Sequence, residues 1–221
     1  MFKPEILCVA AVAGCTASAF AQSFNEGLDA ASGLPAGWTS VNNSPGGPGA
    51  NPDWAQTQSA ATFGPQSGMG YVYADYNSAT GFNNISNYLI SPLVTFSNGD
   101  TISFWTRTVD VVGFPDRLEL TYNTDGSTAP TSFTNPLITI NPNLTFTGYP
   151  SVWTQYSATI SGLAGPTSGR FAFWYNPTTG GPFGNHSDYI GVDDVSYTAV
   201  PGPASLALVG LGVLMTGRHR R

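Results

Sequence analysis

The side chains that could do chemistry in this 221-residue sequence are mostly carboxylates, because its central part, residues 22–199, holds one histidine and no cysteine. Hydrolysis of a glycoside needs two carboxyl groups on either side of one bond, which on a strand requires an even spacing. Asp116 and Glu119 are three residues apart, so a strand would direct them to opposite faces. His186 stands alone in a polar loop sequence, which is typical of a solvated histidine. These patterns favour a non-enzymatic protein over a glycan-active hydrolase.

The carboxylates are better suited to holding a cation or to charging the surface. Calcium binds several oxygens from carboxylates and backbone carbonyls together, and loops rich in Asp, Asn and Gly supply both. Asp193 and Asp194 are adjacent near the end of the last predicted strand, where a regular strand would turn one inward and the other outward. Calcium ligation and plain surface charge are both open for these acids.

Five tryptophans suggest a second kind of site, because exposed aromatic faces stack on sugar rings. Trp54, beside a loop rich in Pro and Gly, and Trp38 are the candidates for carbohydrate binding. Trp105, Trp153 and Trp174 alternate with small or polar residues inside predicted strands, which favours core packing. A carbohydrate-binding module is therefore the alternative function.

The elements that must position these residues are predicted to be short strands. Asn42 to Pro52 contains three prolines and three glycines, so we expect a long loop there. Asn98-Gly99 predicts a tight hairpin, since both residues accept positive φ. Strands are expected over residues 70–74, 88–90, 93–96, 101–107, 117–122, 152–160, 170–175 and 189–197.

The strand over residues 101–107 shows the alternation expected of a sheet with one buried face. Ile102 and Phe104 share one face, while Trp105 and Arg107 share the other. No stretch of the sequence combines a sustained 3.6-residue period with helix caps. The pattern therefore predicts an all-β fold, a β-sandwich.

The N-terminus has the pattern of a signal peptide over residues 1–21. Lys3 precedes an apolar run, and Ala19-Phe20-Ala21 is the small-x-small pattern that signal peptidase reads. Cleavage after Ala21 would leave Gln22 as the first residue of the mature chain.

Cys15 offers a competing interpretation of this leader. Val12-Ala13-Gly14-Cys15 would pass as a lipoprotein box in which Cys15 is lipidated. Both cysteines of the chain, Cys8 and Cys15, lie in the leader. The mature chain after signal-peptidase cleavage is therefore expected to lack disulfides, thiolate metal sites and cysteine nucleophiles.

The C-terminus, residues 200–221, has the pattern of a membrane anchor. An uncharged run over residues 204–216 follows Pro201, Gly202 and Pro203, and the chain ends in Arg218-His219-Arg220-Arg221. The cationic end would stay on the cytoplasmic side of the membrane. Because the run is shorter than the roughly 20 residues of a stable spanning helix, it predicts a transient sorting helix.

The charge balance limits the partners of the segment between these ends. Residues 22–199 hold 12 of the 13 acidic residues but only Arg107, Arg117 and Arg170 among the basic ones. Nucleic-acid binding depends on cationic groups that release counterions, so this balance argues against it. The length of the segment fits one all-β domain with its own core.

The tail resembles the PEP-CTERM sorting signals of diderm bacteria, which combine a short Pro-x-Pro motif, an apolar stretch and a terminal Arg cluster. Gly202 stands where that family usually carries Glu. The resemblance implies cleavage near Pro201-Gly202-Pro203 by an exosortase-like enzyme. It also implies transient anchoring in the inner membrane, then delivery to the cell surface, the outer membrane or the extracellular polysaccharide.

The central segment resembles the choice-of-anchor J domain, which is similar to cleaved-adhesin and MAM-like jelly rolls. The resemblance implies a jelly-roll sandwich and an exported, adhesin-like structural module. The motifs that carry it follow in the family's order, and they are Leu34-Pro35-Ala36-Gly37-Trp38, Asn87-Tyr88-Leu89-Ile90-Ser91-Pro92, Ser103-Phe104-Trp105-Thr106-Arg107, Asp116-Arg117-Leu118-Glu119-Leu120, Tyr149-Pro150-Ser151-Val152-Trp153-Thr154 and Ile190-Gly191-Val192-Asp193-Asp194-Val195.

The same resemblance implies where a metal would bind. Cleaved-adhesin-like jelly rolls build metal sites near the first strand and the final acidic strand. By position, Glu26, Asp193 and Asp194 are the matching residues for a structural Ca²⁺, and no other cofactor is expected.

Overall fold

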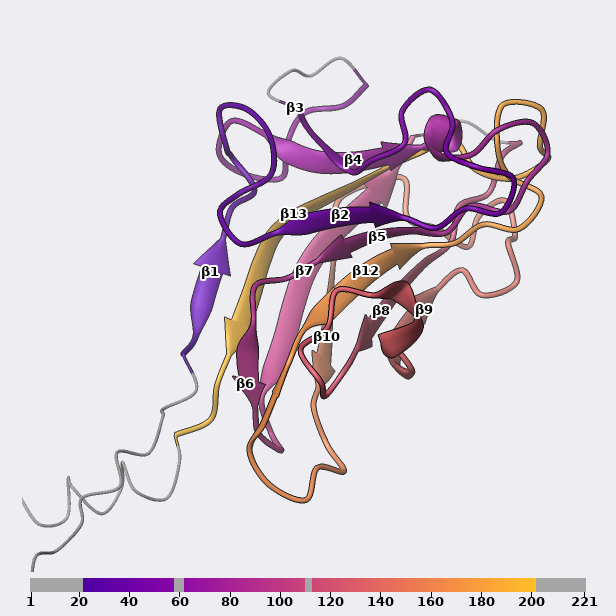
Figure 1. The fold of residues 1–221 in the computed structure, drawn as a ribbon. Coiled ribbons are helices and arrows are strands. Elements are labelled where there is room, and N and C mark those ends of the chain that lie inside the picture. Colours follow the sequence, from indigo (N-terminus) through magenta and orange to yellow (C-terminus); the bar gives the residue numbers. More distant parts are fainter. Residues whose placement is uncertain (1–21, 58–61, 110–112, 202–221) are drawn as a thin grey trace, which may run out of the picture. The chain divides into compact units, whose positions relative to one another are not determined.

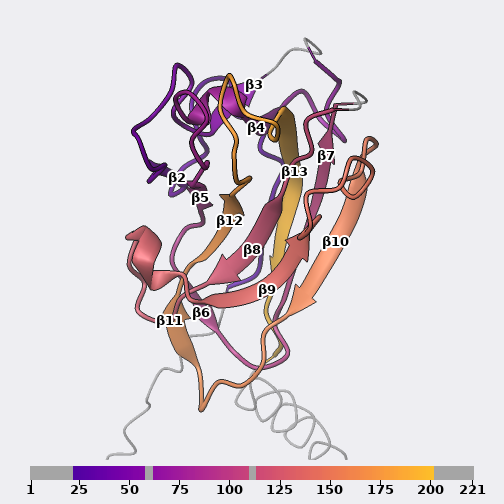
Figure 2. The ribbon, with the colours of Figure 1, turned by 90° about the vertical axis from the view of Figure 1, so that its right-hand side faces the viewer.

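The computed structural model describes residues 22–57, 62–109 and 113–201, and these residues form a β-sandwich. Figures 1 and 2 show two antiparallel sheets stacked on each other, and the edge strands β9 and β10 of the two sheets are in contact. The strands are β1 (Phe24–Glu26), β2 (Thr39–Asn42), β3 (Ala55–Thr57), β4 (Tyr71–Asp75), β5 (Asn87–Ile90), β6 (Val94–Phe96), β7 (Thr101–Thr108), β8 (Leu118–Tyr122), β9 (Asn135–Ile140), β10 (Thr154–Thr159), β11 (Thr167–Gly169), β12 (Phe171–Tyr175) and β13 (Tyr189–Thr198).

Non-consecutive strands pair in both sheets, as in a jelly roll. The six-stranded sheet has the order β10-β7-β13-β4-β3, with β1 paired to β13. The five-stranded sheet has the order β2-β5-β12-β8-β9, and β6 pairs with β11 in a small separate ribbon. Two short 3-10 helices, η1 (Tyr76–Ser78) and η2 (Pro130–Ser132), lie in connections. The expected all-β jelly-roll sandwich is confirmed.

The core lies between the two sheets and is made by alternate residues of the central strands. On β7, Ile102 and Phe104 are fully buried, as the alternation predicts. Phe104 packs edge-on against Phe173 of β12, with ring centroids 4.8 Å apart. Burial of such aromatic side chains contributes roughly 2–3 kcal/mol each, so these contacts dominate the stability of the sandwich.

A second aromatic cluster covers part of the outer face of the six-stranded sheet. Phe63, in the segment after β3, packs against Tyr71, Trp153 and Tyr189 with centroid distances of 5.0 to 5.5 Å. Gly191 lies beneath it, where a Cβ would approach Trp153 to 2.8 Å and Tyr71 to 2.9 Å. The missing side chain at Gly191 therefore lets the segment pack closely on the sheet.

The eight strands expected from the sequence are present, with ends that agree within two residues. The loop expected from Asn42 to Pro52 is also present. The hairpin expected at Asn98-Gly99 is wrong. These residues make a turn, in which the N–H of Asp100 donates to the carbonyl of Ser97 at 3.1 Å, but β6 pairs with β11 and β7 pairs with β10 and β13. The chain crosses from the small ribbon into the six-stranded sheet at this turn.

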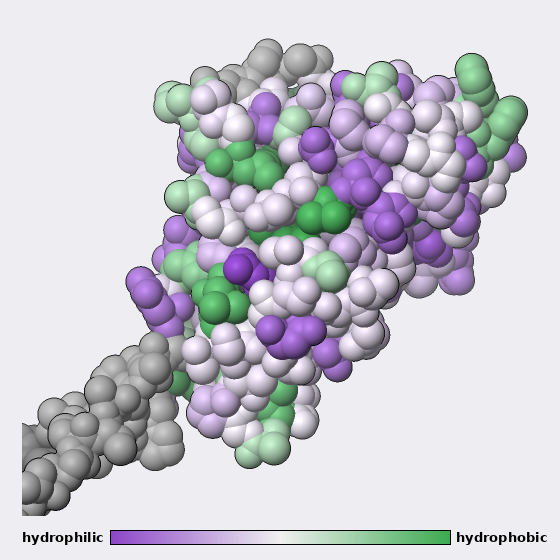
Figure 3. Space-filling model, in the orientation of Figure 1, coloured by the Kyte–Doolittle hydropathy of each residue, from purple (hydrophilic) through white to green (hydrophobic). Residues whose placement is uncertain are grey.

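The signal peptide and the sorting helix expected at the two ends fall on residues 1–21 and 202–221, outside the described residues. Within the described part of the chain, no helix has the length and apolar character needed to span a bilayer. Figure 3 shows the face seen in Figure 1, where hydrophobic residues form separate small patches among polar ones.

Candidate functional site

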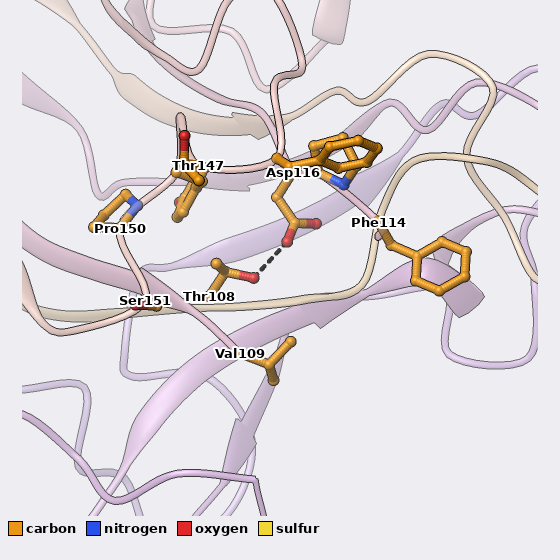
Figure 4. A pocket seen from close by; sticks show the side chains of 10 residues that line it. Thr108, Val109, Phe114, Asp116, Thr147, Pro150 and Ser151 are labelled. Atoms are coloured by element: carbon orange, nitrogen blue, oxygen red, sulfur yellow. Dashed lines mark hydrogen bonds between the residues drawn. The ribbon is translucent and has the colours of Figure 1, made fainter. Parts of the chain in front are cut away.

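The cavity shown in Figure 4 lies at one end of the sandwich and has Asp116 at its base. Its volume is about 310 Å³, and Thr108, Phe114 and Tyr149 are among the residues that line it. Asp116 precedes β8 and is 1% exposed. A buried carboxyl group in a cavity is the feature that a hydrolytic site would need, so its surroundings decide what it can do.

Three groups hold the Asp116 carboxyl group. Oδ1 accepts the hydroxyl of Tyr175 at 2.6 Å and the N–H of Asp188 at 2.9 Å. Oδ2 lies 2.5 Å from Oγ1 of Thr108, the contact drawn in Figure 4. Burial raises the pKa of Asp116 to about 6, although the hydrogen bonds from Thr108 and Tyr175 oppose the shift. Both carboxyl oxygens are therefore used to tie loops to strands.

Asp188 is an acidic neighbour of Asp116, but the two glutamates of the domain lie in different sheets. Glu26 lies in β1 of the six-stranded sheet and Glu119 in β8 of the five-stranded sheet. Nδ1 of His186 lies 2.6 Å from the carbonyl oxygen of Thr178, a contact within one loop. The structure thus separates the residues that were considered for hydrolysis.

The predicted metal residues Glu26, Asp193 and Asp194 lie around the junction of β1 and β13. β1 pairs with β13 so that Glu26 is opposite Val195, one residue after Asp194. A β-bulge interrupts the pairing of β13 with β7 between Asp193 and Ser196. Asp194 sits in this bulge with φ of 46°, so the regular alternation assumed from the sequence is broken there.

Asp193 uses its carboxylate to hold the segment that follows β3. Oδ2 accepts the N–H groups of Gln66 at 2.8 Å and Ser67 at 3.4 Å. Oδ1 accepts the N–H of Asp194 at 2.8 Å. Burial raises the pKa of Asp193 to about 7. These contacts make Asp193 an anchor of the loop, with both oxygens already engaged.

Asp29 was not among the metal ligands predicted from the sequence. Its side chain and that of Asp194 both lie near Gly27. A Cβ on Gly27 would lie 2.8 Å from Oδ2 of Asp29 and 3.9 Å from Oδ1 of Asp194. Oδ1 of Asp29 accepts the N–H groups of Met69 and Gly70, each at 2.8 Å. Asp29 and Gly70 are 41 residues apart in the sequence and meet only in the folded chain. No local sequence pattern could therefore indicate this contact.

The oxygens at this junction fit calcium better than a transition metal. No group of three Asp, Glu, His or Cys side chains able to hold a metal occurs in the described ranges. Calcium, however, also accepts carbonyl oxygens. Oε1 of Gln56 is buried without a hydrogen-bond partner among these residues. Nε2 of Gln56 contacts the carbonyl of Leu28. The carboxylates of Asp29 and Asp194 are hard oxygen donors of the kind that calcium takes.

The tryptophans expected to be exposed are buried, and this part of the carbohydrate-site prediction is wrong. Trp54 is 2% exposed, and its Nε1 donates to the carbonyl of Asn87 at 3.2 Å. Trp38 is 7% exposed and stacks on Phe173 at 6.3 Å. Both precede short strands that the sequence pattern did not reveal, and these strands carry the rings into the core.

The tryptophans expected in the core are the half-exposed ones. Trp105 points to the outer face of β7, opposite the buried Phe104. Trp153 covers the six-stranded sheet and donates from Nε1 to the carbonyl of Gly64 at 2.9 Å. Trp174 lies on the outer face of β12, between the buried Phe173 and Tyr175. The alternation in Phe171-Ala172-Phe173-Trp174-Tyr175 was a usable signal, since it places Trp174 opposite the three core rings.

The residues predicted for processing lie at the limits of the described chain. Gln22 and Pro201 are both exposed. Ala21, Gly202 and Pro203 fall outside the described residues.

Comparison with known proteins identifies relatives of this sandwich. The family model of the Cleaved Adhesin Domain matches residues 21–161. The K1 cleaved adhesin domain of Lys-gingipain from Porphyromonas gingivalis W83 is similar, with 22% identity, a TM-score of 0.59 and coverage of 81% of this chain and 99% of that domain. The K3 domain of the same protein shows 20% identity, a TM-score of 0.53 and coverage of 81% and 100%. A comparison with curated proteins gave no match.

Proposed function

This chain belongs to the Cleaved Adhesin Domain family, and we propose that it is a non-enzymatic adhesive module exported to the surface of a diderm bacterium or to its extracellular matrix. The observation that carries the proposal is the match of the family model over residues 21–161, most of the sandwich. The burial of Asp116 and its bonds to Thr108, Tyr175 and Asp188 support a structural role for this carboxyl group.

The ends of the chain support export and sorting. Residues 1–21 would be removed as a signal peptide, residues 22–199 would form a choice-of-anchor J-like domain, and residues 200–221 would act as a PEP-CTERM-like tail. The tail would hold the chain in the inner membrane until an exosortase-like enzyme cuts near Pro203. The exported sandwich would then associate with surface proteins or extracellular polysaccharide.

Calcium would stabilise this module at the junction of β1 and β13. Asp29 and Asp194 would supply carboxylate oxygens, and Glu26 borders the same junction. A bound divalent cation supplies positive charge, which would offset the repulsion between these carboxylates. The residues of the loop after β3 would then be held more firmly to the sheet.

An adhesion assay tests the proposal. Beads coated with residues 22–201 are mixed with cells of the producing bacterium, and bound beads are counted by flow cytometry. Beads coated with the same protein after thermal denaturation are the control. The proposal predicts more binding by the folded chain, and equal binding by both preparations would refute it.

A second candidate function, carbohydrate binding, is favoured by a specific observation. Trp174 presents part of its ring on the outer face of the five-stranded sheet, beside a cavity that is lined by both apolar and polar side chains.

A further inference from the structure

One row of side chains crosses all strands of the five-stranded sheet on its outer face. The strand registers place Val41 opposite Tyr88, Tyr88 opposite Trp174, Trp174 opposite Glu119, and Glu119 opposite Thr139. The neighbours of Trp174 and Glu119 along their strands belong to the main core, so the row faces away from it. The row joins an aromatic centre to polar side chains on one side.

The ring of Trp174 is held in a fixed orientation. It stacks on Tyr88 with ring centroids 5.2 Å apart and an angle of 11° between the planes. Its Nε1 donates to Oγ of Ser86 at 3.0 Å. Tyr88 is 5% exposed and packs with Ile90 in a small cluster separate from the main core. A ligand that contacts the exposed part of Trp174 would therefore not have to order the ring.

A cavity of about 320 Å³ opens beside Trp174, and its walls combine amide and hydroxyl groups with the apolar surfaces of Pro45, Ile85 and the indole. This volume is at the lower end of the range for small-ligand sites, which is about 300–1,000 Å³. The polar side chains that define it are those of Asn43, Asn84, Ser86, Arg117 and Asn176.

Arg117 is oriented before any ligand arrives. Its Nε donates to Oδ1 of Asn176 at 2.8 Å, and Nη2 donates to the backbone carbonyl of the same residue. Asn84, on the opposite chain segment, accepts the N–H of Thr179 at 2.8 Å through Oδ1. Its NH₂ group has no acceptor within the described residues and can donate to a ligand. Planar donors at fixed positions suit vicinal hydroxyl groups.

The combination of one partly exposed indole with both apolar and hydrogen-bonding groups points to a sugar. A pyranose ring has an apolar face of C–H groups that packs on an indole, and a rim of hydroxyls that accept and donate hydrogen bonds. Among the described residues that line the cavity, Arg117 alone is charged, and the negative charge of Glu119 interacts with it. Because acidic residues also outnumber basic ones over residues 22–199, a polyanion would be repelled.

We propose that Trp174, Arg117 and Asn84 form a binding site for a neutral saccharide on the outer face of the five-stranded sheet. This inference rests on the proposed adhesive function, to which it adds the chemical class of the partner. The site differs from the one expected at Trp38 and Trp54, both of which lie in the core.

The test is a glycan array that carries neutral and acidic oligosaccharides, probed with residues 22–201, which belong to one compact unit. The variants are Trp174→Ala and Trp174→Phe. The matched control is Trp105→Ala, which removes a half-exposed ring from the outer face of the other sheet. Far-UV circular dichroism and urea midpoints confirm that each variant is folded.

The proposal predicts binding to neutral glycans that Trp105→Ala retains and Trp174→Ala weakens by about tenfold or more, as for a central aromatic contact. Trp174→Phe keeps a ring and should keep part of the binding even if Trp174→Ala fails to fold. Neutral-glycan binding that all variants retain would overturn the location. Binding to acidic glycans alone, or to no glycan, would overturn the ligand class. If no neutral glycan is bound but the coated beads still bind cells, the adhesive function stands without this saccharide site. If neither glycans nor cells are bound, both the saccharide site and the adhesive function are refuted.

Discussion

At the scale of single residues, Asp116 shows how a carboxyl group can be buried for structure. It lies between the end of β7, the end of β12 and the segment before β13, and it bonds to Thr108, Tyr175 and Asp188. Thr108 Oγ1 also lies 3.0 Å from the carbonyl of Tyr189. Since a hydroxyl has one proton, a protonated Asp116 would donate to Thr108, which could then donate to that carbonyl.

Replacing Asp116 should change the pH dependence of stability. Its pKa is about 6 in the folded chain and 3.8 in the reference state, so the folded state binds more protons between these values. The contribution of Asp116 to stability is therefore complete below about pH 4 and is lost as the pH rises through 6, which amounts to about 3 kcal/mol. Urea unfolding of Asp116→Asn in chelator should show a smaller fall between pH 4.5 and 7.5.

Asp125→Asn is the matched control for that measurement, because Asp125 is exposed in a loop. It should keep the pH dependence of the parent chain. An equal fall in stability for the Asp116→Asn variant and the parent would contradict the assignment of this titration to Asp116.

Calcium should raise the melting temperature of residues 22–201. A ligand present at a hundredfold excess over its dissociation constant stabilises the folded state by about 2.7 kcal/mol. Magnesium should do much less, because it prefers strict octahedral geometry and keeps its waters. Differential scanning calorimetry in chelator, calcium and magnesium measures the shift.

Asp194→Asn should reduce the increase in melting temperature that calcium causes. Asp53 is exposed, and Asp53→Asn should leave this increase unchanged. Superimposable scans in calcium and in chelator would show that these acids are surface charge. If the double variant Asp29→Asn, Asp194→Asn keeps the full increase in melting temperature with calcium, the ion binds elsewhere.

At the scale of elements, the central strands could be predicted, whereas β1, β2, β3, β9 and β11 could not. β7 shows a clear alternation, and β12 and β13 are rich in aromatic and β-branched residues. β1, in contrast, has three residues and exists through pairing with residues 195–197, about 170 positions away. A local pattern carries no information about such a partner.

The same limit explains what could be predicted of the candidate sites. Asp193 and Asp194 were located at the correct strand, but Asp29 enters the junction through a fold-level contact with residues 69 and 70. Trp54 stands next to a turn-rich loop, which favoured exposure. Its burial depends on contacts with Asn87 and Tyr175 on other strands. Long-range packing therefore decided both cases.

Gly191→Ala should destabilise the packing of the second aromatic cluster on the outer face of the six-stranded sheet. The added Cβ would lie 2.8 to 3.0 Å from Trp153, Tyr71 and Phe63, none of which can move without disturbing the others. Overpacking of this kind costs about 1–3 kcal/mol. Urea midpoints measure the loss, and limited proteolysis should become faster within residues 62–70.

Gly165→Ala is the control, because a Cβ there meets no atom within 4 Å. It should leave both the urea midpoint and the proteolysis rate close to those of the parent. A Gly191→Ala chain as stable as this control would mean that the aromatic cluster repacks freely.

At the scale of the whole molecule, one acidic sandwich is placed between two ends with sorting patterns. Processing at both ends should appear in the mass of the mature protein. Cleavage after Ala21 should leave Gln22 as the first residue, and sorting should remove the residues after about Pro203. A diacylated Cys15 would contradict the signal-peptidase assignment, and an intact Arg221 would show that the tail is retained.

The central claim is that the exported sandwich binds matrix material without cleaving it. Residues 22–201 are incubated with extracellular polysaccharide from the producing bacterium, and the bound protein and the reducing ends released are measured in the same samples. We expect saturable binding, with reducing ends that stay at the level of the protein-free control. Release of reducing ends that increases with time and stops in the Asp116→Asn variant would contradict it.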